Sequence, residues 1–204
     1  MVEGMTTLID SLPFAGPARL RAGDTFIVRE LATLAGGTVR IPDPRKLVHL
    51  QMRRYAGCPI CSLHLRSFVR RKDDLDRAGV REVAVFHSAA EALRRVHAAL
   101  PFDVVPDPRR QLYAALGVTT SPLALFHLRG LRAALRAAFS RASAAPSAGV
   151  ADGPFGLPAD FLVAPHGRII AAKYGVHADD QWSVDDLLPL ASKHIRATDH
   201  RLRP

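Results

Sequence analysis

The only two cysteines of this 204-residue chain stand three positions apart, in a Cys-Pro-Ile-Cys segment at residues 58–61. An apolar run at residues 47–50 precedes them and has the length and composition of a buried strand. A turn at residues 53–57 and then an amphipathic helix follow this run. We therefore expect both cysteines at the point where a buried strand passes into a helix.

This placement favours a reactive thiol at Cys58. A helix N-terminus lowers the pKa of a thiol through its unpaired N–H groups and its dipole, and the thiolate is the nucleophile. Cys58 falls at the expected N-cap and Pro59 at the first helical position, where a missing N–H costs nothing. Arg53 and Arg54 add positive charge nearby. Cys61 lies one turn further along the same face, close enough for a short disulfide, and we expect its sulfur to be the less exposed one.

The sequence also allows other roles for a cysteine pair. Both could be inert core residues, because free cysteine is often buried. A zinc site could use Cys58, Cys61 and His64, with His87 as a distant fourth ligand, but a second cysteine pair is lacking. Haem attachment needs a histidine directly after Cys61, and Ser62 stands there instead. We therefore expect neither a metal nor a cofactor.

Composition and charge narrow the class of protein. With 48% hydrophobic and 23% charged residues, the chain is typical of a globular protein, and we expect one domain over residues 1–204. Its net charge of +9 is spread along the chain and is not interleaved with aromatic residues, which disfavours specific nucleic-acid binding. No apolar stretch is long enough for a membrane span, and residues 1–10 lack the pattern of a signal peptide. We expect a cytoplasmic protein without membrane contact, in which a close cysteine pair is redox-cycling and not a structural staple.

Helical and strand periodicities alternate along most of the chain. Two buried strands separated by a helix predict a parallel β-α-β unit, and an apolar pair of strands around Gly167 predicts an antiparallel hairpin. The first part of the chain is predicted to form a short helix at 6–12, a hairpin at 26–34 and 38–41, and the strand at 47–50. The middle part is predicted to form a helix from 59 to about 78, a strand at 83–86, a helix at 89–100, a strand at 102–105, and a helix at 109–116 capped by Asp107. The last part is predicted to form strands at 161–164 and 169–172 and a helix at 183–194 capped by Ser183, followed by a frayed tail from 197.

Residues 119–153 interrupt this alternation. An amphipathic helix with basic flanks is expected first, followed by a flexible loop rich in Ala, Ser, Pro and Gly at residues 140–153. The helix is either a surface helix that caps the domain or a basic helix that binds a partner or a membrane surface.

The order of elements resembles the α/β thioredoxin-like fold, a mixed central sheet with helices on both faces, here with an N-terminal β-hairpin extension and a helical insertion. Two segments are similar to the peroxiredoxin-like branch of the alkyl hydroperoxide reductase/thiol-specific antioxidant (AhpC/TSA) family: Tyr-Ala-Gly-Cys-Pro-Ile-Cys at 55–61 and His-Ala-Asp-Asp-Gln-Trp-Ser at 177–183. A third, Gly-Leu-Pro-Ala-Asp-Phe-Leu-Val at 156–163, is similar to the segment that carries the cis-proline opposite the cysteines in thioredoxin-fold proteins.

The resemblance implies a redox site. Cys58 would be the attacking cysteine and Cys61 its resolving partner, while Pro158, next to Leu157, would be a cis-proline opposite them. The other residues expected around the pocket are Pro59, Tyr55, Arg54 and His64. His64 either orients the thiolate or is a packed, hydrogen-bonded histidine, and we expect Trp182 to be a core anchor of the last helix.

Three functions are compatible with these residues. The first is a thiol peroxidase that reduces hydroperoxides and is recycled by an external thiol reductant such as a thioredoxin-type protein. The second is a thioredoxin- or glutaredoxin-like thiol–disulfide oxidoreductase acting on protein disulfides. The sequence favours this second function at two positions. Typical peroxiredoxins carry threonine or serine where this chain has Tyr55, and proline where it has Gln51. The third is a non-catalytic binding module. The family resemblance also allows a homodimer.

Overall fold

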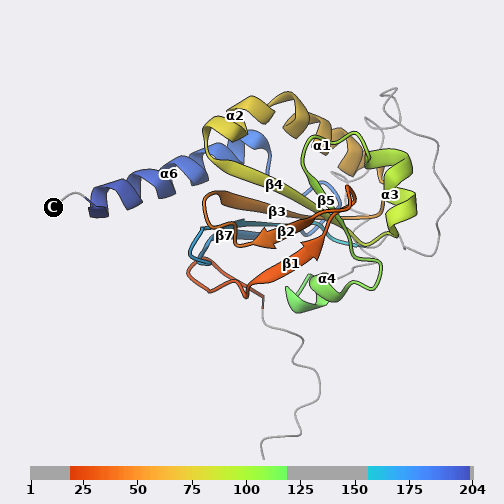
Figure 1. Cartoon of the computed structure of the whole chain (residues 1–204), viewed down its shortest axis with the longest axis horizontal. Coiled ribbons are helices and arrows are strands. Elements are labelled where there is room, and N and C mark those ends of the chain that lie inside the picture. Colours follow the sequence, from red (N-terminus) through yellow and green to blue (C-terminus); the bar gives the residue numbers. More distant parts are fainter. Residues whose placement is uncertain (1–18, 119–155, 203–204) are drawn as a thin grey trace, which may run out of the picture.

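The computed structural model describes residues 19–118 and 156–202, so the predicted helix at 6–12 and the insertion at 119–153 lie outside the described residues. Its centre is a five-stranded sheet of order β5-β4-β3-β6-β7, and a separate hairpin pairs β1 with β2 (Figure 1). The strands are β1 (Arg29–Ala32), β2 (Thr38–Ile41), β3 (Leu47–Arg53), β4 (Val80–Phe86), β5 (Asp103–Pro106), β6 (Ala159–Val163) and β7 (Ile169–Tyr174). The helices are α1 (Pro59–Arg70), α2 (Lys72–Arg77), α3 (Ala90–His97), α4 (Gln111–Ala115) and α6 (Val184–Leu202).

The sheet is mixed, as expected. Strand β3 pairs parallel with β4, and β4 pairs parallel with β5, which confirms the β-α-β unit. Strand β3 also pairs antiparallel with β6, and β6 with β7, which confirms the C-terminal hairpin. Because the carboxyl ends of β3 and β4 lie at the same edge of the sheet, the cysteine segment that follows β3 begins beside the end of β4.

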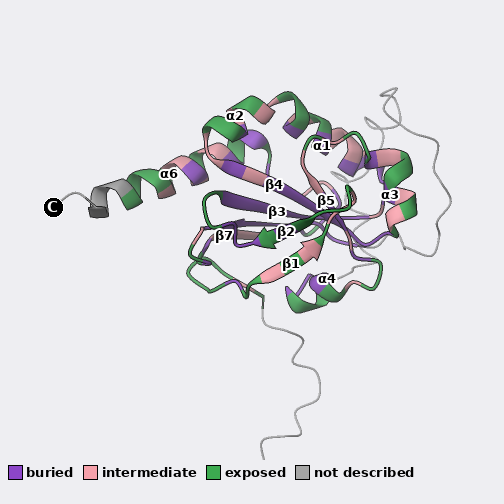
Figure 2. Ribbon diagram, viewed as in Figure 1, coloured by how far each residue is buried: buried purple, intermediate pink, exposed green. Residues whose placement is uncertain are grey.

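Both faces of the sheet are covered. One face packs against the β1–β2 hairpin and α4, through residues such as Leu50, Val85 and Phe161 from the strands and Ile41 and Tyr113 from the cover. The opposite face packs against the other helices (Figure 1). Figure 2 shows the strands largely buried, with exposed residues on the outer sides of the helices.

Alternation along β3 decides what each face contains. Val48, Leu50 and Met52 point into the apolar core beneath the hairpin. The residues between them, His49, Gln51 and Arg53, therefore point to the helix-covered face, since successive side chains of a strand alternate. All seven residues of β3 are buried. Strand β3 thus delivers three polar side chains into the interior next to the cysteine helix.

Two helices differ from the predicted ones. The helix expected from 59 to about 78 is divided at Arg71, whose backbone leaves the helical region, and Asp73 and Asp74 occupy the first turn of α2, where acidic residues favour a new N-terminus. The last helix is capped by Ser183 as predicted, but it continues to Leu202, so the expectation of a frayed tail from 197 is wrong. That tail has no glycine or proline before its last residue.

The prediction of a cis-proline at Pro158 is also wrong. Within residues 19–118 and 156–202, the cis peptide bond is Ile41–Pro42. The Pro158 carbonyl accepts a hydrogen bond from the Gly175 N–H at 2.9 Å, which continues the β6–β7 ladder by one pair. An extended trans backbone suits this continuation.

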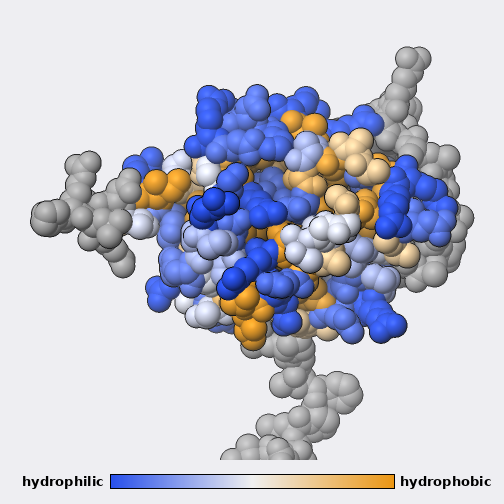
Figure 3. All heavy atoms as spheres, in the orientation of Figure 1, coloured by the Kyte–Doolittle hydropathy of each residue, from blue (hydrophilic) through white to orange (hydrophobic). Residues whose placement is uncertain are grey.

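The surface in Figure 3 is mostly hydrophilic, with small and separate hydrophobic patches. Within the part of the chain that is described, no helix has both the length and the apolar character needed to cross a bilayer.

Candidate active site

The cysteine segment forms the first turn of α1, as the sequence predicts. Cys58 is the N-cap and Pro59 the first helical residue. The Cys58 sulfur accepts a hydrogen bond from the Cys61 backbone N–H at 3.3 Å and another from the Cys61 thiol at 2.8 Å. Both cysteines are free, and both are 0% exposed, so the structure does not show the expected lower exposure of Cys61 relative to Cys58. The two sulfurs are therefore placed to form a bond with each other.

The surroundings of Cys58 stabilise its thiolate. Burial works to raise the pKa of Cys58, but the Cys61 thiol, the Arg54 charge and the backbone N–H groups of the helix start outweigh it and lower this pKa to about 7. The Arg54 guanidinium lies 3.7 Å from the sulfur. Burial and the neighbouring Cys58 sulfur raise the pKa of Cys61 well above its usual value of 9.0. Near neutral pH, Cys58 is therefore the nucleophile of the pair, and Cys61 is its protonated partner.

The loop before Cys58 is held from two sides. The Ala56 N–H donates to the Ser88 hydroxyl at 3.0 Å, and His97 Nε2 donates to the Ala56 carbonyl at 3.0 Å. The His97 ring also stacks on Phe86, with ring centroids 4.7 Å apart. These contacts tie the loop to the end of β4 and to α3, so that the position of Cys58 depends on both.

A network of buried polar side chains lies on the same face of the sheet. The Arg53 guanidinium donates to Asp160 at 2.6 Å and to Gln51 at 2.9 and 2.6 Å. His49 donates to Glu82 at 2.7 Å and to Asp160 at 3.2 Å, and Gln51 donates to the same oxygen of Glu82. All five residues are buried. Two cationic and two anionic side chains are therefore held together away from water.

The charges of this network depend on one another. Burial opposes the charged form of His49, but Glu82 and Asp160 raise its pKa to about 9. Burial also opposes the charged form of Asp160, but Arg53 and His49 keep its pKa well below the usual range. The network is therefore stable as a set of ions, and removal of one member leaves another unpaired.

The orientation of the His64 ring is set by its contact with the buried polar network and not by the Cys58 thiolate. The Arg53 guanidinium donates to His64 Nε2 at 3.2 Å, and the His64 ring packs on Phe68 with centroids 4.9 Å apart. Burial and the Arg53 charge lower the pKa of His64 well below 6.5, so its nitrogen is free to accept. Of the two open readings, these contacts match the packed, hydrogen-bonded histidine.

The other predicted pocket residues approach the cysteine turn to different degrees. Tyr55 is half-buried, and the Arg54 guanidinium lies 5.6 Å from its ring centroid. Because Met52 pairs with Ala159, Leu157 and Pro158 run beside the residues that lead from β3 into the cysteine turn. Arg53 points into the buried network and not toward Cys58.

Sequence reasoning missed the network and its links to the helices. The predicted strand ends at residue 50 and the predicted turn begins at Arg53, whereas Gln51 and Arg53 both belong to β3 and are fully buried. Asp160 also accepts from the Trp182 N–H at 3.0 Å, which ties the start of α6 to the network, and Trp182 is a core residue as expected. The period-two spacing of His49, Gln51 and Arg53 is the signal that could have revealed it.

No group of three or more His, Cys, Asp or Glu side chains suited to a metal ion occurs within residues 19–118 and 156–202. The proposed zinc set of Cys58, Cys61 and His64 is thus not assembled there, because the His64 ring faces Arg53.

Comparison with known proteins places the fold. The structure is similar to the peroxidoxin BcpB of Mycobacterium tuberculosis, at 13% identity and a TM-score of 0.57, covering 91% of this chain and 100% of that one. It is similar to AhpC of the same organism, at 16% identity and a TM-score of 0.61, covering 88% and 96%. A reduced 2-Cys peroxiredoxin of Plasmodium vivax matches at 12% identity and a TM-score of 0.62, covering 88% and 84%. The fold is therefore thioredoxin-like, of the peroxiredoxin type.

The sequence itself matches a family model, described as AhpC/TSA antioxidant enzyme, over residues 67–177. The matched segment is more than half of the chain and begins after Cys61, so the cysteine turn lies outside it. Among curated proteins, none matches the sequence. The chain belongs to the AhpC/TSA antioxidant enzyme family, and it is a thiol oxidoreductase.

Proposed function

We propose that the protein reduces hydroperoxides through a dithiol–disulfide cycle of Cys58 and Cys61. The observation that carries the proposal is the paired sulfur geometry: a helix-capping Cys58 with its pKa lowered to about 7, and a Cys61 thiol 2.8 Å away. Family membership supports a hydroperoxide as the oxidant.

The cycle balances with these two residues. The Cys58 thiolate attacks the terminal oxygen of a hydroperoxide, which breaks the O–O bond and releases an alcohol after protonation, and Cys58 becomes a sulfenic acid. The Cys61 sulfur then attacks the Cys58 sulfur and water leaves, which forms the disulfide. An external dithiol, such as that of a thioredoxin-type protein, reduces it by exchange and becomes oxidised in turn.

Arg54 would be the residue that keeps Cys58 reactive. Its guanidinium is buried beside the sulfur and above the Tyr55 ring, so its charge is little screened by solvent. Tyr55 and Pro59 are half-buried, whereas both cysteines are hidden. A substrate would therefore reach the sulfur from the Tyr55 side of the turn.

Rapid mixing of reduced protein with hydrogen peroxide and with an alkyl hydroperoxide tests the proposal. We expect Cys58 to be oxidised far faster than free cysteine, with one disulfide formed per chain. Reduction of insulin disulfides, assayed in parallel, tests the second candidate, which the adjacent sulfurs also favour. Oxidation no faster than that of free cysteine, together with ready reduction of insulin, would replace the peroxidase by a disulfide oxidoreductase.

Substitution Arg54→Met should raise the pKa of Cys58 from about 7 toward its usual 9.0, because the nearest positive charge is lost. A higher pKa lowers the thiolate fraction at neutral pH, so the rate with peroxide there should fall roughly fivefold. The pH dependence of thiolate absorbance and of peroxide reaction measures both. Arg66→Met, a change of an exposed arginine on α1, is the matched control and should leave both the Cys58 pKa and the peroxide rate unchanged. An unaltered Cys58 pKa in folded Arg54→Met protein would show that Arg54 does not stabilise the thiolate.

A further inference from the structure

The side chain of Tyr113, on α4, joins the carboxyl ends of β3 and β4. Its hydroxyl donates to the backbone carbonyl of Arg53 and, at 2.9 Å, to that of Val85. A hydroxyl has one proton, so the two carbonyl oxygens share it. Arg53 is the last residue of β3 and pairs with Phe86, the last residue of β4. The Tyr113 hydroxyl therefore lies where the pairing of the two strands ends and the segment leading to the cysteines begins.

Other contacts hold Tyr113 in this position. The Asp107 carboxylate accepts from three consecutive backbone N–H groups of α4, the last of which belongs to Tyr113, at 3.4 Å. The Asp107 N–H in turn donates to the Phe86 carbonyl at 2.7 Å. The Tyr113 ring packs edge-on against His87, with centroids 5.6 Å apart. Burial raises the pKa of Tyr113 well above its usual 10.0, so the hydroxyl stays a donor near neutral pH.

The bond to Arg53 reaches the redox site through one peptide group. Because a peptide group is planar, a fixed Arg53 carbonyl also fixes the Arg54 nitrogen and the direction in which the chain leaves β3. The Arg54 guanidinium lies 3.7 Å from the Cys58 sulfur. The bonds to Ala56 fix the middle of the segment, whereas the bond from Tyr113 fixes its start. Since the effect of a charge falls with distance, the pKa of Cys58 depends on where Arg54 is held.

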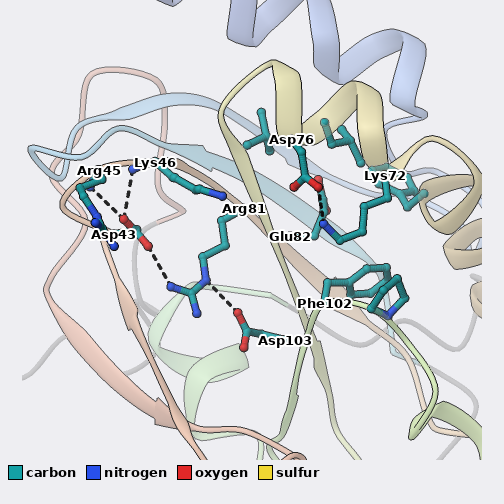
Figure 4. A pocket seen from close by; sticks show the side chains of 13 residues that line it. Asp43, Arg45, Lys46, Lys72, Asp76, Arg81, Glu82, Phe102 and Asp103 are labelled. Carbon is teal, nitrogen blue, oxygen red and sulfur yellow. Dashed lines mark hydrogen bonds and ion pairs between the residues drawn. The ribbon is translucent and has the colours of Figure 1, made fainter.

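The amino ends of the same strands are joined in a different way. There Arg81, on β4, donates to Asp43, before β3, and to Asp103, on β5, each at 2.8 Å (Figure 4). These three residues line a cavity of about 500 Å³ at the end of β3 that is remote from Cys58. They hold the same sheet without bearing on the cysteine turn, so they offer a control for a loss of stability alone.

We propose that Tyr113 is a positioning residue of the redox site: its hydroxyl holds the peptide between Arg53 and Arg54, so that the Arg54 guanidinium stays beside the Cys58 sulfur. Tyr113 acts through Arg54 and takes no part in the chemistry of the sulfur. The inference rests on the proposed role of Cys58 as the nucleophile, and it holds whichever oxidant or disulfide Cys58 meets.

Substitution Tyr113→Phe tests the inference, because it removes the hydroxyl and keeps the ring that packs against His87. We expect the pKa of Cys58 to rise from about 7, since the Arg54 charge is no longer held in place. The thiolate fraction near pH 6 should then fall roughly threefold. Thiolate absorbance of the reduced full chain, followed through a pH titration without peroxide, measures both. An unchanged Cys58 titration in folded Tyr113→Phe protein overturns the inference.

Combination with Arg54→Met shows whether Tyr113 acts through Arg54. The double variant should titrate as Arg54→Met alone does, because no guanidinium remains to be held. Shifts that add would show that Tyr113 affects Cys58 by another route, and would also overturn the inference. Failure of the peroxidase proposal is a separate result: wild-type protein would react slowly with peroxide, while Tyr113→Phe would still change the Cys58 titration.

Two control variants separate positioning from a general loss of stability. Tyr174→Phe removes a hydroxyl that donates to the Leu116 carbonyl at 2.7 Å, and Arg81→Met removes the bonds at the amino ends of the strands. Both should lower the midpoint of urea unfolding and leave the Cys58 titration unchanged. If either raised the pKa of Cys58 as much as Tyr113→Phe does, this pKa would follow the stability of the sheet, and Tyr113 would have no positioning role.

Discussion

Replacement of Cys58 by serine is expected to reduce turnover with hydroperoxides to the background of the assay, a loss on the order of a thousandfold or more. The serine hydroxyl keeps the size of the side chain and can still cap α1, but at neutral pH it is not ionised and cannot attack the O–O bond. The consumption of peroxide in the presence of an external dithiol measures the loss. A Cys58→Ser protein with full turnover would refute the cycle.

Cys61→Ser is the matched variant of the other sulfur. It leaves the nucleophile in place but removes the partner that resolves it. One equivalent of peroxide should then oxidise Cys58 once and stop at the sulfenic acid, which mass spectrometry detects directly or after trapping. If the Cys61→Ser protein formed no sulfenic acid and cycled at the wild-type rate, Cys61 would not be the resolving residue.

The second large effect is expected on stability, from Asp160→Asn. The amide keeps the shape of the side chain but not its charge, so the Arg53 guanidinium stays buried and loses its ionic partner. Arginine cannot release its proton in proteins, and such an unpaired buried charge costs about 3–5 kcal/mol. Urea unfolding followed by circular dichroism measures the change in the free energy of unfolding.

Two controls separate this effect from a general loss of acidic charge. Asp185→Asn removes an exposed partner of Arg71 and should leave the unfolding midpoint unchanged. Adding Arg53→Met to Asp160→Asn should recover part of the lost stability, because both charges of the pair are then absent. If the Asp160→Asn protein were as stable as the wild type, a group other than Asp160 would have to balance the buried charge of Arg53.

The parts of the site that the sequence predicted are those decided by neighbours along the chain. Cys58 as N-cap, Pro59 after it and Cys61 one turn later follow from local rules of helix geometry. The alternation of strands and helices likewise predicted the mixed sheet. The division at Arg71 was missed because a change of two backbone angles leaves the helical periodicity of the sequence almost intact.

The features that were missed depend on contacts between distant segments. Gln51, Glu82 and Asp160 come from three strands, and only the register of the sheet brings them to one place. The conformation of Pro158 is set by its pairing with Gly175, more than fifteen positions away. The burial of Cys58 arises from the packing of α1 against β4 and α3, which no local pattern shows.

The complete burial of Cys58 has a kinetic consequence. In the proposed cycle, a hydroperoxide meets the buried Cys58 sulfur only after a local opening of the cysteine turn, so the observed rate constant is expected to be the product of an opening equilibrium and the intrinsic rate of the uncovered thiolate. The hydrogen bonds that hold Ala56 to Ser88 and His97 set the first factor, while Arg54 sets the second. Peroxide sensitivity can therefore be adjusted in either direction by loosening or tightening a loop, without any change in the chemistry of the sulfur.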